Sequence, residues 1–104
     1  MWRGLLEDLQ AETPVPVISA RFHLGLAVAV ADMAVQLATT AKIGTIVLTG
    51  GCFQNKILFE ACVSRIGDSG LACLTQSQVP MNDGGLALGQ AAIATAREIK
   101  ARAA

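Results

Sequence analysis

The segment Thr45–Gly51 constrains the fold of this chain more than any other. Its first five residues, Thr-Ile-Val-Leu-Thr, are mostly β-branched, and two glycines follow at once. A short run of this kind between glycines is typical of a buried strand in a parallel sheet. Leu71–Thr75 is a second short apolar run and predicts a second strand.

Helical patterns surround these two strands. Ser19 is placed to cap a long helix over residues 20–41, whose large apolar side chains recur at spacings of three and four. These side chains are Phe22, Leu26, Val30, Met33 and Leu37. Asn55 is placed to cap a helix over 56–67, and a last helix is expected over 84–101. The order helix, strand, helix, strand, helix predicts an α/β layer with parallel strands.

Residues 1–18 are expected to form a connector with one short helix. Pro14 and Pro16 predict an extended stretch after that helix, because proline disfavours the helical conformation of the residue before it. Two strands are fewer than an independent sheet usually needs. We therefore expect residues 19–104 to be one incomplete domain, the C-terminal part of something larger.

The composition argues against nucleic-acid binding and a membrane span, and it indicates a partner that covers apolar surface. Only 15% of the residues are charged, against about 25% in an ordinary soluble domain. Eight basic residues balance eight acidic ones, so no excess charge is present to bind nucleic acid. The longest apolar stretch, Leu24–Ala38, contains Asp32 and Gln36 and is shorter than the roughly 20 residues of a membrane span. We expect a cytoplasmic protein whose exposed apolar surface docks on a partner or on a second copy.

The turn at Gly50 and Gly51 is the first candidate site. Ligands bind α/β sheets beyond the carboxyl ends of the strands, and glycines let backbone amides approach a phosphate closely. Asn55 has two open interpretations at this stage: it binds a ligand hydroxyl, or it only caps its own helix.

Asp83 marks the second candidate site, between Asn82 and Gly84. It is either an ordinary helix cap, a role that Asn82 would serve almost as well, or a carboxylate that binds a metal or phosphate site. His23 is a third candidate, for which a hydrogen-bonded structural role competes with a functional one. A zinc site made by this chain alone is not expected, because the three cysteines form no CxxC pair and His23 is the only histidine. Among the cysteines, Cys52 in the glycine turn is expected to be the accessible one.

Three segments together resemble the C-terminal end of the HypF family. They are Ala20–His23, Val47–Asn55 and Val79–Gln90, and the opening Trp2–Leu9 also matches the approach to this region. The resemblance implies a large carbamoyltransferase of nickel–iron hydrogenase maturation, with acylphosphatase-like, zinc-finger, YrdC-like and Kae1-like parts. Such an enzyme uses carbamoyl phosphate and ATP to make carbamoyl adenylate. Its Kae1-like part, of the actin/sugar-kinase/Hsp70 superfold, transfers the carbamoyl group to the C-terminal cysteine of HypE.

The resemblance also assigns roles to the candidate residues. Gly50, Gly51 and Asn55 would contact the nucleotide, and Asp83 would be a ligand of a divalent metal, either zinc or iron, with magnesium a further option. The residues that would line the cleft are His23, Asn82 and Gly84, and no residue of this chain is assigned as catalytic. The implied partners are HypE and the remaining HypF domains, with no nucleic acid and no membrane.

One departure from the family pattern limits these expectations. The family's metal-binding histidine pair lies outside these 104 residues. The isolated chain is therefore expected to hold no metal, to bind ATP weakly and to be inactive. Two alternatives remain at this stage: a related transferase of carbamoyl or threonylcarbamoyl groups to a small molecule or tRNA, and a non-catalytic interaction module.

Overall fold

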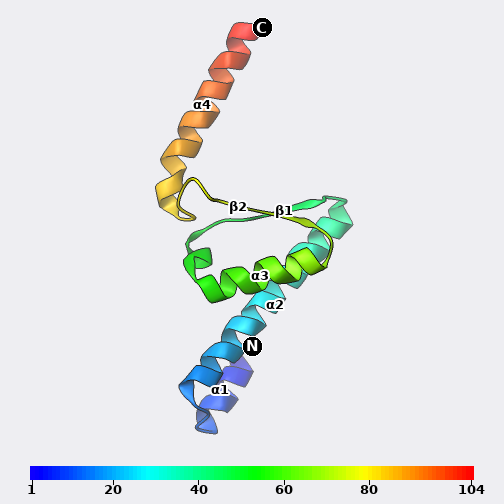
Figure 1. Cartoon of the computed structure of the whole chain (residues 1–104), viewed down its shortest axis with the longest axis vertical. Coiled ribbons are helices and arrows are strands. Elements are labelled where there is room, and N and C mark those ends of the chain that lie inside the picture. The colour runs from blue at the N-terminus through cyan, green and yellow to red at the C-terminus, as the bar shows by residue number, and fades with distance from the viewer.

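The computed structural model describes residues 1–104 and has the predicted α/β order, preceded by a short helix (Figure 1). The helices are α1 (Trp2–Gln10), α2 (Val15–Ala41), α3 (Lys56–Asp68) and α4 (Leu86–Ala103). The strands are β1 (Thr45–Leu48) and β2 (Ala72–Thr75). Two short 3-10 helices, η1 (Gly51–Gln54) and η2 (Asp83–Gly85), precede α3 and α4.

The two strands form a parallel sheet. Thr45 is paired with Ala72 at one end of the register, and Leu48 with Thr75 at the other. The carboxyl ends of both strands therefore lie at the same edge. Just beyond this edge the Thr49 hydroxyl donates a hydrogen bond to Gln76 Oε1, at 2.9 Å. This edge positions the glycine turn after β1 beside the loop after β2.

Helix α2 begins earlier than the sequence predicts. Pro14 is its N-cap and Pro16 lies in its first turn, so the predicted extended stretch and the Ser19 cap are wrong. The physical reason is that first-turn N–H groups have no acceptor within the helix, so proline loses no hydrogen bond there. Helix α2 runs without a break across residue 18, and the division of the chain into connector and domain stays a prediction.

The core is a small cluster where α2 and α3 pack on the sheet. Its fully buried members are Ala27, Ala31, Leu48, Leu58, Cys62 and Ile66. Helix α2 thus packs through its alanines, which let α3 approach closely. Its large side chains Met33 and Leu37, part of the apolar stripe found in the sequence, are each 64% exposed, so no element of the chain covers them. Ile57 of α3, which the sequence pattern places inward, is also exposed, at 62%.

The chain as a whole is extended. Helix α4 projects away from the sheet and has no buried residue (Figure 1). The radius of gyration is 18.4 Å, whereas a compact domain of this length has about 13 Å. Only 8 of the 104 residues are buried, so the apolar faces of α2 and α4 have no partner within the chain.

Helix α2 is long and apolar enough to cross a membrane, judged by length and composition alone. Its 27 residues exceed the apolar stretch considered in the sequence, because the helix begins at Val15 and continues to Ala41. Core helices of soluble proteins and N-terminal signal sequences can be equally long and apolar. Two ion pairs tie charged residues of α2 to its neighbours: Asp32 binds Arg65 of α3, and Arg21 binds Asp8 of α1.

Candidate functional site

The glycine turn lies directly beyond β1. Gly50 has φ 106° and ψ 155°, a conformation that is essentially restricted to glycine. Gly51 then begins η1, and a Cβ atom at Gly51 would lie 4.0 Å from the Cβ of Asn82. The structure therefore brings the glycine turn next to the Asn82 loop, although 31 positions separate Gly51 from Asn82 in the chain.

The structure shows which residue of the loop before α4 caps the 3-10 helix η2. Asn82 Oδ1 accepts a hydrogen bond from the backbone N–H of Gly84, at 2.9 Å, so Asn82 is the cap of η2. Asp83 is the first residue of η2, is exposed and takes part in none of the chain's ion pairs. Its carboxylate is thus not used for capping. A Cβ at Gly84 would come within 2.9 Å of Asn82 Oδ1, so a larger residue there would displace the side chain that caps η2.

Asn55 uses its side chain within the chain. Its Oδ1 accepts a hydrogen bond from the backbone N–H of Leu58, at 3.2 Å, which confirms the predicted cap of α3. Its Nδ2 lies 2.8 Å from Nε2 of His23. The carboxamide keeps one N–H and one oxygen lone pair for a ligand, so the capping role does not exclude the predicted nucleotide contact.

His23 joins the site through Asn55, which sequence reasoning missed. Its Nδ1 lies 2.8 Å from the carbonyl oxygen of Ser19, one turn earlier in α2. The imidazole is half-buried and packs edge-on against Phe22, with ring centroids 6.1 Å apart. His23 and Asn55 lie 32 residues apart, and no local pattern signals such a pair.

These elements make one edge with two helical N-termini. Helix α3 follows the glycine turn through η1, and α4 follows Asp83 through η2, both at the side where the strands end (Figure 1). Helix N-termini favour anions because their first N–H groups are unpaired. The arrangement is suited to a phosphate-bearing ligand. It does not make a metal site alone, because no three His, Cys, Asp or Glu residues come together in the chain.

The three cysteines differ in accessibility, and all are free. Cys52 of the glycine turn is exposed, as the sequence predicts. Cys62 lies in the core, with its Sγ 3.9 Å from the carbonyl oxygen of Ala27. Burial raises the pKa of the Cys62 thiol and also that of the half-buried Cys73. The thiols of Cys62 and Cys73 are therefore poor nucleophiles.

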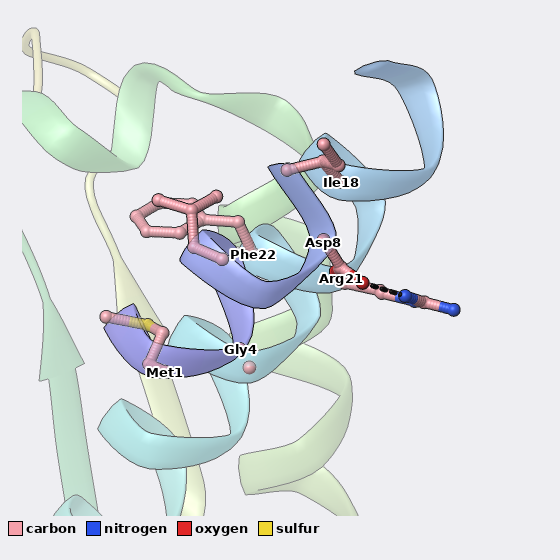
Figure 2. A pocket seen from close by; sticks show the side chains of 8 residues that line it. Met1, Gly4, Asp8, Ile18, Arg21 and Phe22 are labelled. Atoms are coloured by element: carbon pink, nitrogen blue, oxygen red, sulfur yellow. Dashed lines mark hydrogen bonds and ion pairs between the residues drawn. The ribbon is translucent and has the colours of Figure 1, made fainter. Parts of the chain in front are cut away.

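A separate cavity lies between α1 and α2, away from this edge (Figure 2). Its volume is about 190 Å³, and Phe22 and Ile18 of α2 face Gly4 of α1 and the N-terminal Met1 across it. The ion pair between Asp8 and Arg21 closes one side. None of the predicted site residues lines this cavity, so it is not part of the candidate site.

Comparison with known proteins gives consistent matches. Residues 1–90 match the family model described as "Carbamoyltransferase, Kae1-like Domain, second subdomain". The chain is 42% identical over 93 residues to carbamoyltransferase HypF2 of Cupriavidus necator, and this match covers 89% of the chain. It is also 42% identical over 80 residues to carbamoyltransferase HypF of Rhodobacter capsulatus, a match that covers 77% of the chain.

A solved structure is similar as well. The crystal structure of full-length HypF in the phosphate- and nucleotide-bound form superimposes with a TM-score of 0.84 and 36% sequence identity. The match covers 89% of this chain but 12% of that one. The chain likewise spans 12% of the Cupriavidus protein and 11% of the Rhodobacter protein, so these relatives are much longer.

Proposed function

This chain belongs to the HypF carbamoyltransferase family, as the second subdomain of its Kae1-like domain, and we propose that it forms one wall of a nucleotide-binding carbamoyl-transfer cleft. One observation carries the proposal: the glycine turn and the Asn82–Asp83 loop meet where both strands end. The similar HypF structure is described as phosphate- and nucleotide-bound, which supports a nucleotide as the class of ligand. We also propose that the subdomain has the actin/sugar-kinase/Hsp70 superfold, because it matches the Kae1-like family model.

In this proposal the residues of the edge bind ATP and carbamoyl adenylate. The absence of a side chain at Gly51 lets a ligand approach the backbone, and the N-termini of α3 and α4 favour its phosphate. Asn55 contributes its free N–H to a ligand hydroxyl. Hydrogen-bond donors that neutralise the adenylate phosphate make the carbamoyl carbon more open to attack by a thiolate, here the C-terminal cysteine of HypE. The sulfur bonds to this carbon, the carbon–oxygen bond to the phosphate breaks, and AMP leaves with the negative charge on its phosphate.

Asp83 is the proposed metal ligand of the complete enzyme. Its carboxylate is exposed and free of ion pairs, and oxygen donors suit zinc, iron and magnesium. When bound, a divalent metal supplies charge neutralisation near the phosphates. One carboxylate is too few ligands, so the remaining ones come from the rest of the protein, and the isolated chain is proposed to be inactive.

The remaining HypF domains are the proposed cover of the apolar faces. Met33 and Leu37 on α2 are each 64% exposed and Ile93 on α4 is 49% exposed, and exposed apolar surface of this kind marks sites where another protein surface docks. The ion pair of Asp32 with Arg65 lies in the middle of α2, where a bilayer would make it costly. We therefore assign α2 to the core of a larger cytoplasmic protein.

The test uses the complete carbamoyltransferase that contains this segment. Gly51→Ala places a methyl group where the ligand approaches the backbone, with no contact closer than 4.0 Å within the chain. It should weaken ATP binding about tenfold or more, the effect of losing one charge-assisted hydrogen bond, and slow carbamoylation of HypE. Calorimetry measures the first effect, and mass spectrometry of HypE measures the second.

Gly67→Ala is the matched control, because Gly67 lies in α3 and an added Cβ there meets no atom within 4 Å. It should bind ATP like the unsubstituted protein. Equal ATP affinity of the Gly51→Ala protein would contradict the proposed site. Transfer to tRNA or to a small molecule in place of HypE would favour the related transferases over the HypF activity.

A further inference from the structure

The contact between His23 and Asn55 has a definite direction. The backbone N–H of Leu58 can only donate, so the Asn55 atom that it meets at 3.2 Å must be the carboxamide oxygen. The Asn55 atom facing His23 is then the amide nitrogen, which donates. Nε2 of His23, 2.8 Å away, must therefore accept and carries no proton.

The other ring nitrogen agrees with this assignment. Nδ1 lies 2.8 Å from the carbonyl oxygen of Ser19, which can only accept a hydrogen bond. Nδ1 must therefore carry the proton. Each contact along the series Ser19, His23, Asn55 and Leu58 has one donor and one acceptor only when the imidazole is neutral and protonated at Nδ1.

We propose that His23 is a positioning residue that fixes the Asn55 carboxamide for the nucleotide. This inference rests on the proposed function, since it assumes that Asn55 contacts that ligand. Asn55 is exposed, and an exposed carboxamide held only by the Leu58 N–H can still swing its amide group. Hydrogen bonds hold both the oxygen and the nitrogen of the Asn55 carboxamide. Its second N–H and the free lone pair of its oxygen therefore point in a fixed direction before the ligand binds. Less conformational freedom is then lost on binding.

The tautomer can be measured directly. His23 is the only histidine of the chain, so a sample of the chain labelled with ¹⁵N-histidine, and shown by circular dichroism to be folded, gives one imidazole spin system. Long-range ¹H–¹⁵N correlation at neutral pH should show the Nδ1–H form, and Asn55→Ala should shift the Nε2 resonance. A dominant Nε2–H form would overturn the proposal.

Two substitutions separate positioning from packing in the complete protein. His23→Gln places an amide oxygen near the position of Nε2, so it keeps the acceptor but loses the ring against Phe22. His23→Phe keeps the ring and loses the acceptor. If His23 positions Asn55, His23→Phe should weaken ATP binding about three- to tenfold, the worth of one hydrogen bond, and His23→Gln should restore most of it. Equal binding by His23→Phe and the unsubstituted protein would overturn the proposal.

A double-mutant cycle with Asn55→Ala completes the test. Because His23 acts through Asn55, His23→Phe should add less than twofold to the ATP-affinity loss of Asn55→Ala, where independent effects would multiply. Multiplying effects would refute the positioning role while leaving the proposed nucleotide site intact. If Asn55→Ala alone leaves ATP binding unchanged, the nucleotide contact itself is wrong and the positioning role falls with it.

Discussion

Ile66→Ala should remove most of the stability of the isolated chain. Ile66 is fully buried, at 0% exposure, in the cluster where α2 and α3 pack on the sheet. Three carbon atoms are lost, worth about 2.4 kcal/mol at about 0.8 kcal/mol each. A residual cavity raises the cost to about 3 kcal/mol. A chain of this length has a free energy of unfolding of about 5–15 kcal/mol, and so few buried residues place this one at the low end.

Ile57→Ala is the matched control, because Ile57 lies on the same helix but is 62% exposed. It should change the free energy of unfolding by less than about 0.5 kcal/mol. Urea unfolding followed by circular dichroism at low protein concentration measures both variants. With an m-value of about 1 kcal/mol/M, the midpoints should fall by about 3 M and by less than about 0.5 M.

Two outcomes would refute this reasoning. Similar shifts for the two variants would mean that burial within the chain does not decide its stability. The absence of a cooperative transition in the unsubstituted chain would mean that the α2–α3 cluster is not a folding core by itself.

Three further predictions follow from other contacts. The Arg65 hydrogen bond lowers the pKa of Asp32 below its ordinary 3.8, so this ion pair should stabilise the fold above pH 3.8 and lose its effect as the pH falls through the lower, folded-state value. In urea titrations Asp32→Asn should therefore destabilise the chain at pH 7, and the difference should shrink as the pH falls below 3.8 through the folded-state pKa of Asp32; a constant difference would contradict this. Gly50→Ala should cost about 1–3 kcal/mol in the same assay, because φ is 106°, and an unchanged midpoint would refute the strained turn. Cys52 should react with a thiol reagent under native conditions well before Cys62, with peptide mapping as the readout, and equal rates would contradict the burial of Cys62.

The local parts of the site could be predicted from the sequence. The Gly50–Gly51 turn after a strand and the Asn55 cap both depend on residues within a few positions of one another, and both are confirmed. The sequence does not decide between Asn82 and Asp83 as the cap before α4, because the two residue types have similar capping propensities. In the structure the backbone of the turn places the Gly84 N–H within reach of Asn82 Oδ1, so Asn82 is the cap. This backbone geometry exists only in the folded turn.

The packing face of α2 could not be predicted in the same way. Periodicity finds the stripe of large side chains, and in most helices such a stripe is the buried one. Here the alanines at positions 27 and 31 are buried in its place, because α3 approaches α2 closely. The large side chains Met33 and Leu37 remain exposed.

The sequence by itself determined the order of the elements, the glycine turn, the cap of α3 and the family. The elements, the turn and the cap follow from hydrogen bonds and periodicities that span one or two turns. The family follows from the sequence motifs. Only the tertiary structure decided that His23 meets Asn55 and that Gly51 lies beside Asn82. The members of each pair are about 30 positions apart in the sequence and meet only because the helices and strands pack together. The local conformational preferences of the residues do not determine this packing.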